Sequence, residues 1–293
     1  MAAGFLNVLK PPGMSSHDVV ANVRKIFHTK RVGHAGTLDP GAAGVLPVAL
    51  GHATRLVEYI SSAGKAYRLE LLLGVSTDTG DDGGAILECR RDFPIPSREA
   101  VLAAMQKFTG TILQRPPVYS AIKLHGRRAY ELAREKQAVE MPLRQVTIHD
   151  LRLIEAHKSQ FLFDLECSKG TYVRSFCRDF GEALGIPATM GFLLRTRVGS
   201  FFLHEAFSLE EIARFGEETL VPAETAVLHL PRFEMPEHRI QPFLHGLSTG
   251  GMELTAEEKL LRVYGRGRFL GIGRYEAAMQ ELRPVKVFRE MSD

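Results

Sequence analysis

The sequence has little cysteine, no tryptophan and no hydrophobic segment long enough to cross a membrane. Its three cysteines, Cys89, Cys167 and Cys177, are scattered and form neither a metal-binding spacing nor a disulfide framework, which indicates a reducing compartment. A transmembrane helix needs about 20 apolar residues in succession, and the N-terminal residues carry no signal-peptide pattern. We therefore expect a cytoplasmic protein with no membrane partner.

The net charge of the chain is also small. The 37 lysines and arginines and the 34 aspartates and glutamates leave a net charge of +3, which by itself does not predict nucleic-acid binding, although local basic clusters still could. An apolar content of 45% and a charged content of 24% are typical of a globular protein. With 293 residues, the chain is long enough for one large domain and a smaller one.

Apolar periodicity predicts helices interleaved with strands along most of the chain. The predicted strands cover residues 5–9, 45–50, 67–73, 145–156, 160–167 and 192–202. The first predicted helix begins after Ser15 or Ser16, either of which can cap it. Four more helices are predicted over 53–61, 97–108, 125–136 and 171–184. Because several strands follow one another directly, we expect an α+β fold with a mixed, mostly antiparallel sheet flanked by helices.

A second domain is predicted near the C-terminus. From about Leu230 and Pro231 onward, short apolar runs are separated by glycines, which is the pattern of short strands joined by tight turns. This pattern is typical of a small β-barrel. We therefore divide the chain into a larger domain over residues 1–230 and a small β-domain over 231–293.

The segment from Gly33 to Pro40 places a single carboxylate, Asp39, on a loop bounded by glycine and proline just before the predicted strand 45–50. Pro40 disfavours the α region at Asp39 and pushes it toward an extended conformation. An acid held on a stiff loop beside a core strand can serve as a nucleophile or a base. The alternative is that Asp39 only closes the turn, as aspartates in such loops often do.

Two other segments carry an aromatic ring or a cation that could take part in chemistry. Tyr67 begins a strand between Lys65 and Arg68, and as an isolated feature it is equally a half-buried strand aromatic. Arg174 lies in the first turns of a helix that Thr171 is expected to cap, where a cation is mildly unfavourable. This mismatch indicates a carboxylate partner, which the planar guanidinium could hold through two hydrogen bonds.

Taken together, these segments resemble the TruB-type pseudouridine synthases. The resemblance extends over nearly the whole chain, from Lys10–Asp18 through the His34–Asp39 loop and Tyr67 to Ser168–Arg174 and Leu194–Arg195. It implies that Asp39 is the catalytic aspartate and that Arg174 pairs with it. It also implies that Tyr67 stacks on the target base and takes part in proton removal.

The resemblance assigns further residues to RNA binding. It implies that His34 helps to hold flipped-out nucleotides and that Leu194 lines the uracil pocket. Other implied substrate contacts are Lys10, Tyr172, Lys123, Arg127 and Arg128. The segment 123–142 is similar to the family's mobile RNA-clamping insertion. Residues 231–293 are similar to a PUA domain, which holds the acceptor end of tRNA.

The implied activity is the isomerisation of uridine to pseudouridine at position 55 in the T loop of tRNA. The target base must leave its stack, Asp39 starts the break of the N1–C1′ bond, and C5 is then joined to C1′. Attack at C6 and attack at C1′ both remain open. Because the reaction involves no redox change and no net group transfer, we expect neither a cofactor nor a metal.

Two other functions remain open from the sequence. One is a tRNA-binding protein that helps tRNA to fold, and the other is a guide-RNA-directed relative that acts on ribosomal RNA together with partner proteins. The chain ends soon after Phe288 without an extended basic tail. This favours a monomeric, stand-alone enzyme with no obligate protein partner.

Overall fold

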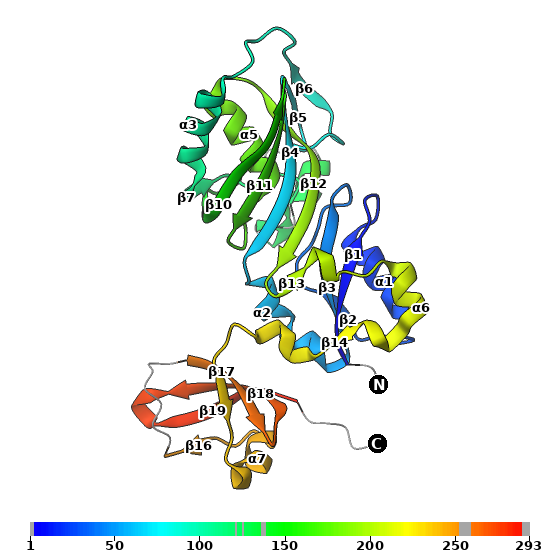
Figure 1. Ribbon diagram of the computed structural model, residues 1–293, viewed down its shortest axis with the longest axis vertical. Coiled ribbons are helices and arrows are strands. Elements are labelled where there is room, and N and C mark those ends of the chain that lie inside the picture. The colour runs from blue at the N-terminus through cyan, green and yellow to red at the C-terminus, as the bar shows by residue number, and fades with distance from the viewer. Residues whose placement is uncertain (1–2, 121, 125, 136–138, 252–258, 289–293) are drawn as a thin grey trace.

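The computed structural model describes residues 3–120, 122–124, 126–135, 139–251 and 259–288, and Figure 1 shows two domains arranged end to end. The larger domain is built on one long twisted sheet. Its strands follow the order β14, β1, β3, β12, β4, β11, β10 and β7, with β13 beside β12 and β2 beside β3.

The bounds of these strands are β1 Gly4–Lys10, β2 Val32–His34, β3 Ala43–Leu50, β4 Lys65–Leu73, β7 Gly110–Gln114, β10 Arg144–His157, β11 Gln160–Cys167, β12 Ala188–Val198, β13 Phe201–Phe202 and β14 Leu220–Val221. Among the named strands in the described part of this sheet, β12 and β3 pair in parallel and the other pairs are antiparallel. The prediction of an α+β fold with a mixed, mostly antiparallel sheet is therefore confirmed.

The predicted caps are mostly those observed. Ser15 caps α1 (Ser16–Ile26) in a capping box with Asp18, which settles the choice between Ser15 and Ser16. Ser97 caps α3 (Arg98–Phe108), and α5 (Val173–Leu184) ends at Gly185, whose φ of 70° suits glycine. The helix α6 (Leu209–Phe215) begins after a third capping serine, Ser208.

The predicted cap at Thr171 was wrong. The N-cap of α5 is Tyr172, which makes no side-chain capping bond. The hydroxyl of Thr171 donates instead to the Ser168 carbonyl, at 3.0 Å. The backbone N–H of Tyr172 is bound from outside the helix, by the side-chain oxygen of Gln114 at 2.8 Å.

Two predicted helices also differ from the structure. Residues 53–61 are divided between a 3₁₀ turn, Gly51–Leu56, and the short helix α2, Val57–Ser61. The described part of 125–136 begins as a small hairpin, with β8 (Lys123–Leu124) paired to β9 (Arg127–Arg128), and only then forms α4 (Ala129–Arg134). Gly126, at φ +87°, interrupts the helical pattern because it forms the turn.

The core of the larger domain lies between its sheet and the helices that cover it. Helices α3 and α5 pack on β4, β10 and β11 through an aromatic cluster of Phe108, Phe163, Phe176 and Phe180. Helices α1 and α6 cover β1 and β3 through a second, aliphatic cluster. The hairpin of β5 (Val75–Thr77) and β6 (Ile86–Cys89) stands apart from the main sheet.

The smaller domain has its own sheet and core. Its strands follow the order β15 (Arg232–Glu234), β17 (Lys259–Gly265), β18 (Arg268–Glu276), β19 (Glu281–Val287) and β16 (Thr249–Gly250), and α7 (Glu237–Leu244) packs against them. Short 3₁₀ turns at Leu203–Glu205, Gly216–Thr219, Ala223–Val227 and Ala277–Met279 complete the described elements.

The two domains are joined by specific contacts. Arg55 donates to the Val287 carbonyl at 2.7 Å and lies over the ring of Phe288, and Lys286 pairs with Glu58 at 2.9 Å. Ile272 of the smaller domain is buried in the same apolar cluster as Leu56 of the larger one. None of the helices in the described residues is both long and apolar enough to cross a membrane.

The aromatic cluster generates a stability prediction. Phe176 is fully buried and contacts three other phenylalanine rings, so Phe176→Ala should lower the free energy of unfolding by about 3–5 kcal/mol. Urea denaturation followed by circular dichroism measures this change. Phe202→Ala, at a phenylalanine that is 40% exposed, is the matched control and should cost much less. Equal losses in the two variants would contradict this account of the core.

Candidate active site

A cavity of about 260 Å³ lies between the Gly36–Asp39 loop, the start of β4 and the segment that leads into α5. Its lining includes Lys65, Tyr67, Ser120, Tyr172 and Leu193, together with Asp39 and Arg174. The fold therefore brings the three predicted catalytic residues, Asp39, Tyr67 and Arg174, from distant parts of the chain to one cavity.

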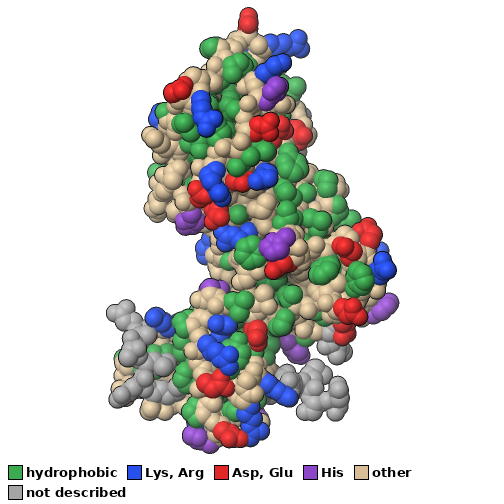
Figure 2. Space-filling model, viewed as in Figure 1, with side chains coloured by type: hydrophobic (Ala, Val, Ile, Leu, Met, Phe, Trp, Pro, Cys, Tyr) green, Lys and Arg blue, Asp and Glu red, His purple; other side chains and the backbone are tan. Residues whose placement is uncertain are grey.

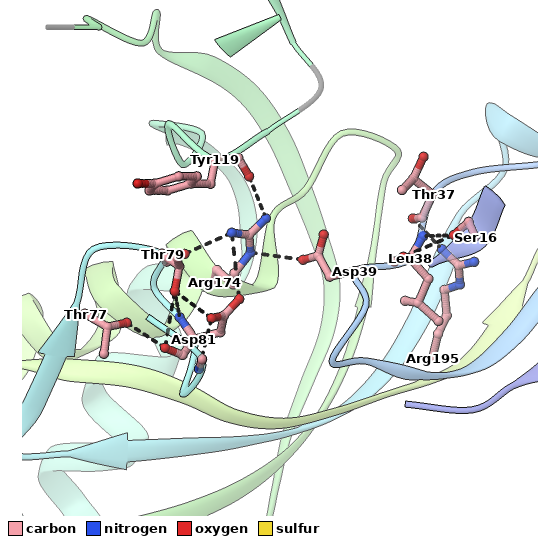
Figure 3. A network of polar contacts seen from close by, with 11 residues as sticks. Ser16, Thr37, Leu38, Asp39, Thr77, Thr79, Asp81, Tyr119, Arg174 and Arg195 are labelled. Carbon is pink, nitrogen blue, oxygen red and sulfur yellow. Dashed lines mark hydrogen bonds and ion pairs between the residues drawn. The ribbon is translucent and has the colours of Figure 1, made fainter. Parts of the chain in front are cut away.

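Asp39 and Arg174 form the predicted ion pair, with 3.0 Å between Nε of the arginine and Oδ2 of the aspartate (Figure 3). The expected pair of hydrogen bonds to this carboxylate is absent, because the other two guanidinium nitrogens donate to the carbonyls of Thr79 and Tyr119, at 2.9 and 3.0 Å. Asp81 lies farther off, at 3.9 Å. Arg174 is thus held on several sides, and its side chain is 7% exposed against 39% for Asp39.

The loop that carries Asp39 is fixed by buried side chains from other elements. Arg195, on β12, donates to the carbonyls of Gly36, Thr37 and Val45, at 3.1, 3.2 and 2.8 Å. The hydroxyl of Ser16, on α1, accepts from the Leu38 N–H at 2.9 Å and donates to its carbonyl at 3.1 Å. Figure 3 shows the contacts of Ser16 with Leu38 and of Arg195 with Thr37 near Asp39.

Lys10 completes this support, and its predicted direct contact with substrate needs correction. The side chain is fully buried, and its ammonium donates to the carbonyls of Pro11, Pro40 and Ala42, at 2.7, 3.1 and 2.7 Å. Burial, followed by the nearby Arg195 charge, lowers the pKa of Lys10 to about 8. Lys10 therefore lies beneath the loop and holds its backbone.

Tyr67 forms a wall of the cavity and is 7% exposed. Burial raises its pKa to about 12, although the neighbouring Arg195 guanidinium acts in the opposite direction. The side chain is therefore a neutral phenol at pH 7. The tyrosine lines the cavity, and its hydroxyl interacts with the Arg195 guanidinium.

Of the remaining predicted contacts, some line this cavity and others lie outside its lining. Tyr172 lines it, and burial raises the pKa of this tyrosine. Leu193 lines it in place of the predicted Leu194, which pairs with Ala43 and Arg68 within the sheet. His34 lies outside the lining, packed edge-on against His17, and burial lowers its pKa.

The predicted RNA-clamping segment, 123–142, lies partly outside the described residues. Lys123, Arg127 and Arg128 are exposed. Arg127 pairs with Glu135, and Arg128 donates to the Tyr130 hydroxyl at 3.0 Å. Figure 2 shows lysine and arginine side chains interspersed with acidic ones on the face in view, as the small net charge predicts.

Sequence reasoning assigned no role to Lys65, Ser120 or Arg195, and it considered Ser16 only as a possible helix cap. Arg195 lay inside a segment already singled out, but nothing in its spacing distinguished a buried side chain from an exposed one. Within the described ranges, no group of three or more His, Cys, Asp or Glu side chains is placed to hold a metal ion.

The contact between Ser16 and Leu38 generates a second prediction. Ser16→Ala leaves a buried N–H and a buried carbonyl without their partner, so it should lower the free energy of unfolding by about 1–3 kcal/mol. Ser62→Ala, which removes an exposed serine bonded to the Tyr59 carbonyl, is the control and should have little effect. Thermal and urea unfolding measure both variants, and a neutral Ser16→Ala would contradict the assigned support.

Comparison with known families places this geometry in context. Residues 24–173 match the model of the TruB family pseudouridylate synthase N-terminal domain, and residues 174–228 match that of the tRNA pseudouridylate synthase B C-terminal domain. The chain is 47% identical to tRNA pseudouridine synthase B of Moorella thermoacetica, covering 99% of this chain and 100% of that protein. It is 41% identical to the protein of the same name from Heliobacterium modesticaldum, covering 98% and 96%.

Solved structures show the same fold. An H/ACA RNP bound to a substrate RNA containing 2′-deoxyuridine includes a chain that matches with a TM-score of 0.76 at 25% identity, covering 98% of this chain and 85% of that one. A chain of a Cbf5–Nop10–Gar1 complex matches with a TM-score of 0.73 at 28% identity, covering 98% and 84%. By its matched domains and its near full-length relatives, this chain belongs to the TruB family of pseudouridylate synthases.

Proposed function

We propose that this protein converts uridine to pseudouridine at position 55 in the T loop of tRNA. The observation that carries the proposal is the Asp39–Arg174 ion pair, which lies beside Tyr67 in one cavity. Family membership supplies the reaction class, and the names of relatives at 41–47% identity supply tRNA as the substrate. The T loop and position 55 follow from the resemblance of the motifs.

The geometry suits a base that has left its stack. Extrusion of a nucleotide costs a few kcal/mol, and stacking on an aromatic ring returns about 1–3 kcal/mol per base. Tyr67 and Leu193 supply such a surface inside the cavity. The larger exposure of Asp39 leaves its carboxylate open to the incoming nucleotide, while the buried Arg174 fixes the orientation of that carboxylate.

The chemistry needs one nucleophile, the loss of one proton and the gain of another. Asp39 bonds to C1′ as the N1–C1′ bond breaks, or to C6 before it breaks. After the base turns, C5 bonds to C1′ and the bond to Asp39 breaks, which regenerates the carboxylate; the C5 proton then leaves and N1 takes up a proton. Ionised Asp39 is the nucleophile in this scheme. Tyr67 is a neutral phenol that orients the base. It can accept the C5 proton only after its hydroxyl has lost the phenol proton.

The proposed binding mode uses both domains. Lys123, Arg127 and Arg128 lie on the segment proposed to clamp the RNA, and residues 231–293 are proposed to act as a PUA domain on the acceptor end. One tRNA per monomer is the proposed stoichiometry. The guide-RNA alternative is less well supported, since the matching RNP chains are 25–28% identical and the tRNA-named relatives are 41–47% identical.

Removing the nucleophile tests the proposed reaction. Asp39→Asn should bind unmodified tRNA transcript as wild type does and lower the single-turnover rate by more than about 10⁴-fold, the scale seen when a nucleophile is lost. Product is measured by tritium release from C5-labelled uridine and mapped by its position in the transcript. Asp92→Asn, at an exposed aspartate that lines neither of the two pockets in which Asp39 lies, is the control and should remain active.

Three results would count against the proposal. Wild type that binds tRNA without forming product would favour a tRNA-folding role. Product outside the T loop would refute the assigned position. An active Asp39→Asn variant would refute the assigned nucleophile.

The clamp proposal makes a separate electrostatic prediction. If Lys123 contacts a phosphate, Lys123→Ala should reduce the slope of log K against log salt for tRNA binding by about one. Lys158→Ala, at an exposed lysine in the β10–β11 turn, is the matched control and should leave the slope unchanged. Binding titrations between low and moderate salt measure both slopes. An unchanged slope for Lys123→Ala would remove this residue from the RNA contact surface.

A further inference from the structure

Buried and partly buried cations outnumber carboxylates in and beneath the cavity. Arg174 has carboxylate partners in Asp39 and, farther off, Asp81. Lys65 and Arg195, in contrast, have no carboxylate within 4.0 Å among the described residues. Burying a cation without an opposite charge is unfavourable, so such groups are candidates for function.

Lys65 is the one of these two cations that faces the cavity. It lines the cavity beside Asp39 and Tyr67, and it stands two residues before Tyr67 on β4, so both side chains project from the same face of the strand. The loop packs over it closely, since a Cβ added at Gly36 would lie 3.6 Å from Cε of Lys65 and 4.0 Å from Arg195.

The ammonium of Lys65 is only partly satisfied by the protein. It donates to the carbonyls of Ser61 and Ala63, at 3.3 and 3.2 Å, which are the end of α2 and the turn after it. An ammonium has three N–H donors, so one is left without a partner in the described part of the chain. A lysine that served only to cap α2 would not need to line the cavity.

We propose that Lys65 stabilises the negative charge that forms on the uracil ring during the reaction. This inference rests on the proposed function. It holds for either route of attack. If the N1–C1′ bond breaks first, its electron pair remains on N1 and spreads to O2 and O4. If Asp39 adds to C6 first, the pair is placed on C5 and O4. A fixed donor in a dry site stabilises either anion.

The charged state of Lys65 is set by its surroundings. The groups around it are Arg195 on β12, Cys167 at the end of β11, Lys169 two residues later and Tyr67 on its own strand. Asp39, Tyr172 and Arg174 line the same cavity. Burial, then the Arg195 charge, lowers its pKa to about 8. Lys65 is therefore charged below pH 8 and loses its charge as the pH rises above it, so the rate should be full below pH 8 and fall above it.

The test compares Lys65→Met and Lys65→Arg with wild type in single-turnover assays at saturating enzyme, on C5-tritiated tRNA transcript, between pH 6 and 9. Lys65→Met should lower the rate at pH 7 by about 10²–10³-fold, the effect of losing one such donor, with the Kd for tRNA unchanged. Lys65→Arg should recover most of the rate and remove the decline above pH 8. Melting temperatures are measured for every variant.

One control isolates the effect. Lys107→Met removes an exposed lysine on α3, outside the cavity lining, and should leave both the rate and its decline above pH 8 unchanged.

Four results would overturn the inference. A Lys65→Met variant with normal rate would refute it. A weakened Kd at unchanged rate would make Lys65 a phosphate contact instead. A lower melting temperature without rescue by Lys65→Arg would make it a structural cap of α2. A decline above pH 8 that persists in Lys65→Arg would also refute it, because the decline would then come from another group. Wild type that forms no product would refute the proposed function itself, which separates the two failures.

Discussion

The structure of the site depends on the hydrogen bonds that side chains donate to the backbone carbonyls of the loop carrying Asp39. Residues 36–42 are neither helix nor sheet, and a buried carbonyl without a partner is unfavourable. Arg195 binds the carbonyls of Gly36 and Thr37, Ser16 that of Leu38, and Lys10 those of Pro40 and Ala42. The carbonyl of Asp39 accepts from the Ala42 N–H within the loop, at 3.1 Å. The position of the Asp39 carboxylate is therefore set by elements that lie far from it in sequence.

The sheet brings these elements together. The parallel contact of β12 with β3 sets Arg195 opposite Gly44, where an added Cβ would lie 2.2 Å from the Arg195 carbonyl. Gly44 also has a φ of +113°, so both the close approach and the backbone conformation require glycine. From this register, the Arg195 side chain reaches back under the loop and lies beside Tyr67 of the next strand, β4. One strand pairing thus couples the nucleophile loop to the aromatic wall of the cavity.

Much of the fold and part of the site could be predicted from the sequence. The Ser15 and Ser97 caps and the strand around Tyr67 rest on local signals. An electrostatic mismatch predicted a carboxylate partner for Arg174, and the family resemblance implied that this partner is Asp39. Long-range contacts could not be predicted in this way. The resemblance assigned Lys10 and Leu194 to substrate contacts. In the structure the loop covers Lys10, and Leu193 lines the cavity where β12 pairs irregularly with β4. Both placements depend on long-range contacts. Thr171 failed as a cap because Gln114, from β7, binds the helix start instead.

The contact between the two domains has a consequence for binding entropy. Arg55, Lys286 and the buried Ile272 hold the smaller domain against the larger one through hydrogen bonds, an ion pair and apolar packing. When domains of a chain are free to reorient, a ligand that spans both must restrict that motion, and the lost freedom weakens binding. Here the relative orientation is established during folding. A long, rigid ligand that reaches from the Asp39 cavity to the smaller domain would bind a preorganised surface and would not have to restrict domain motion. A ligand that contacts only one domain would gain no affinity from this fixed orientation.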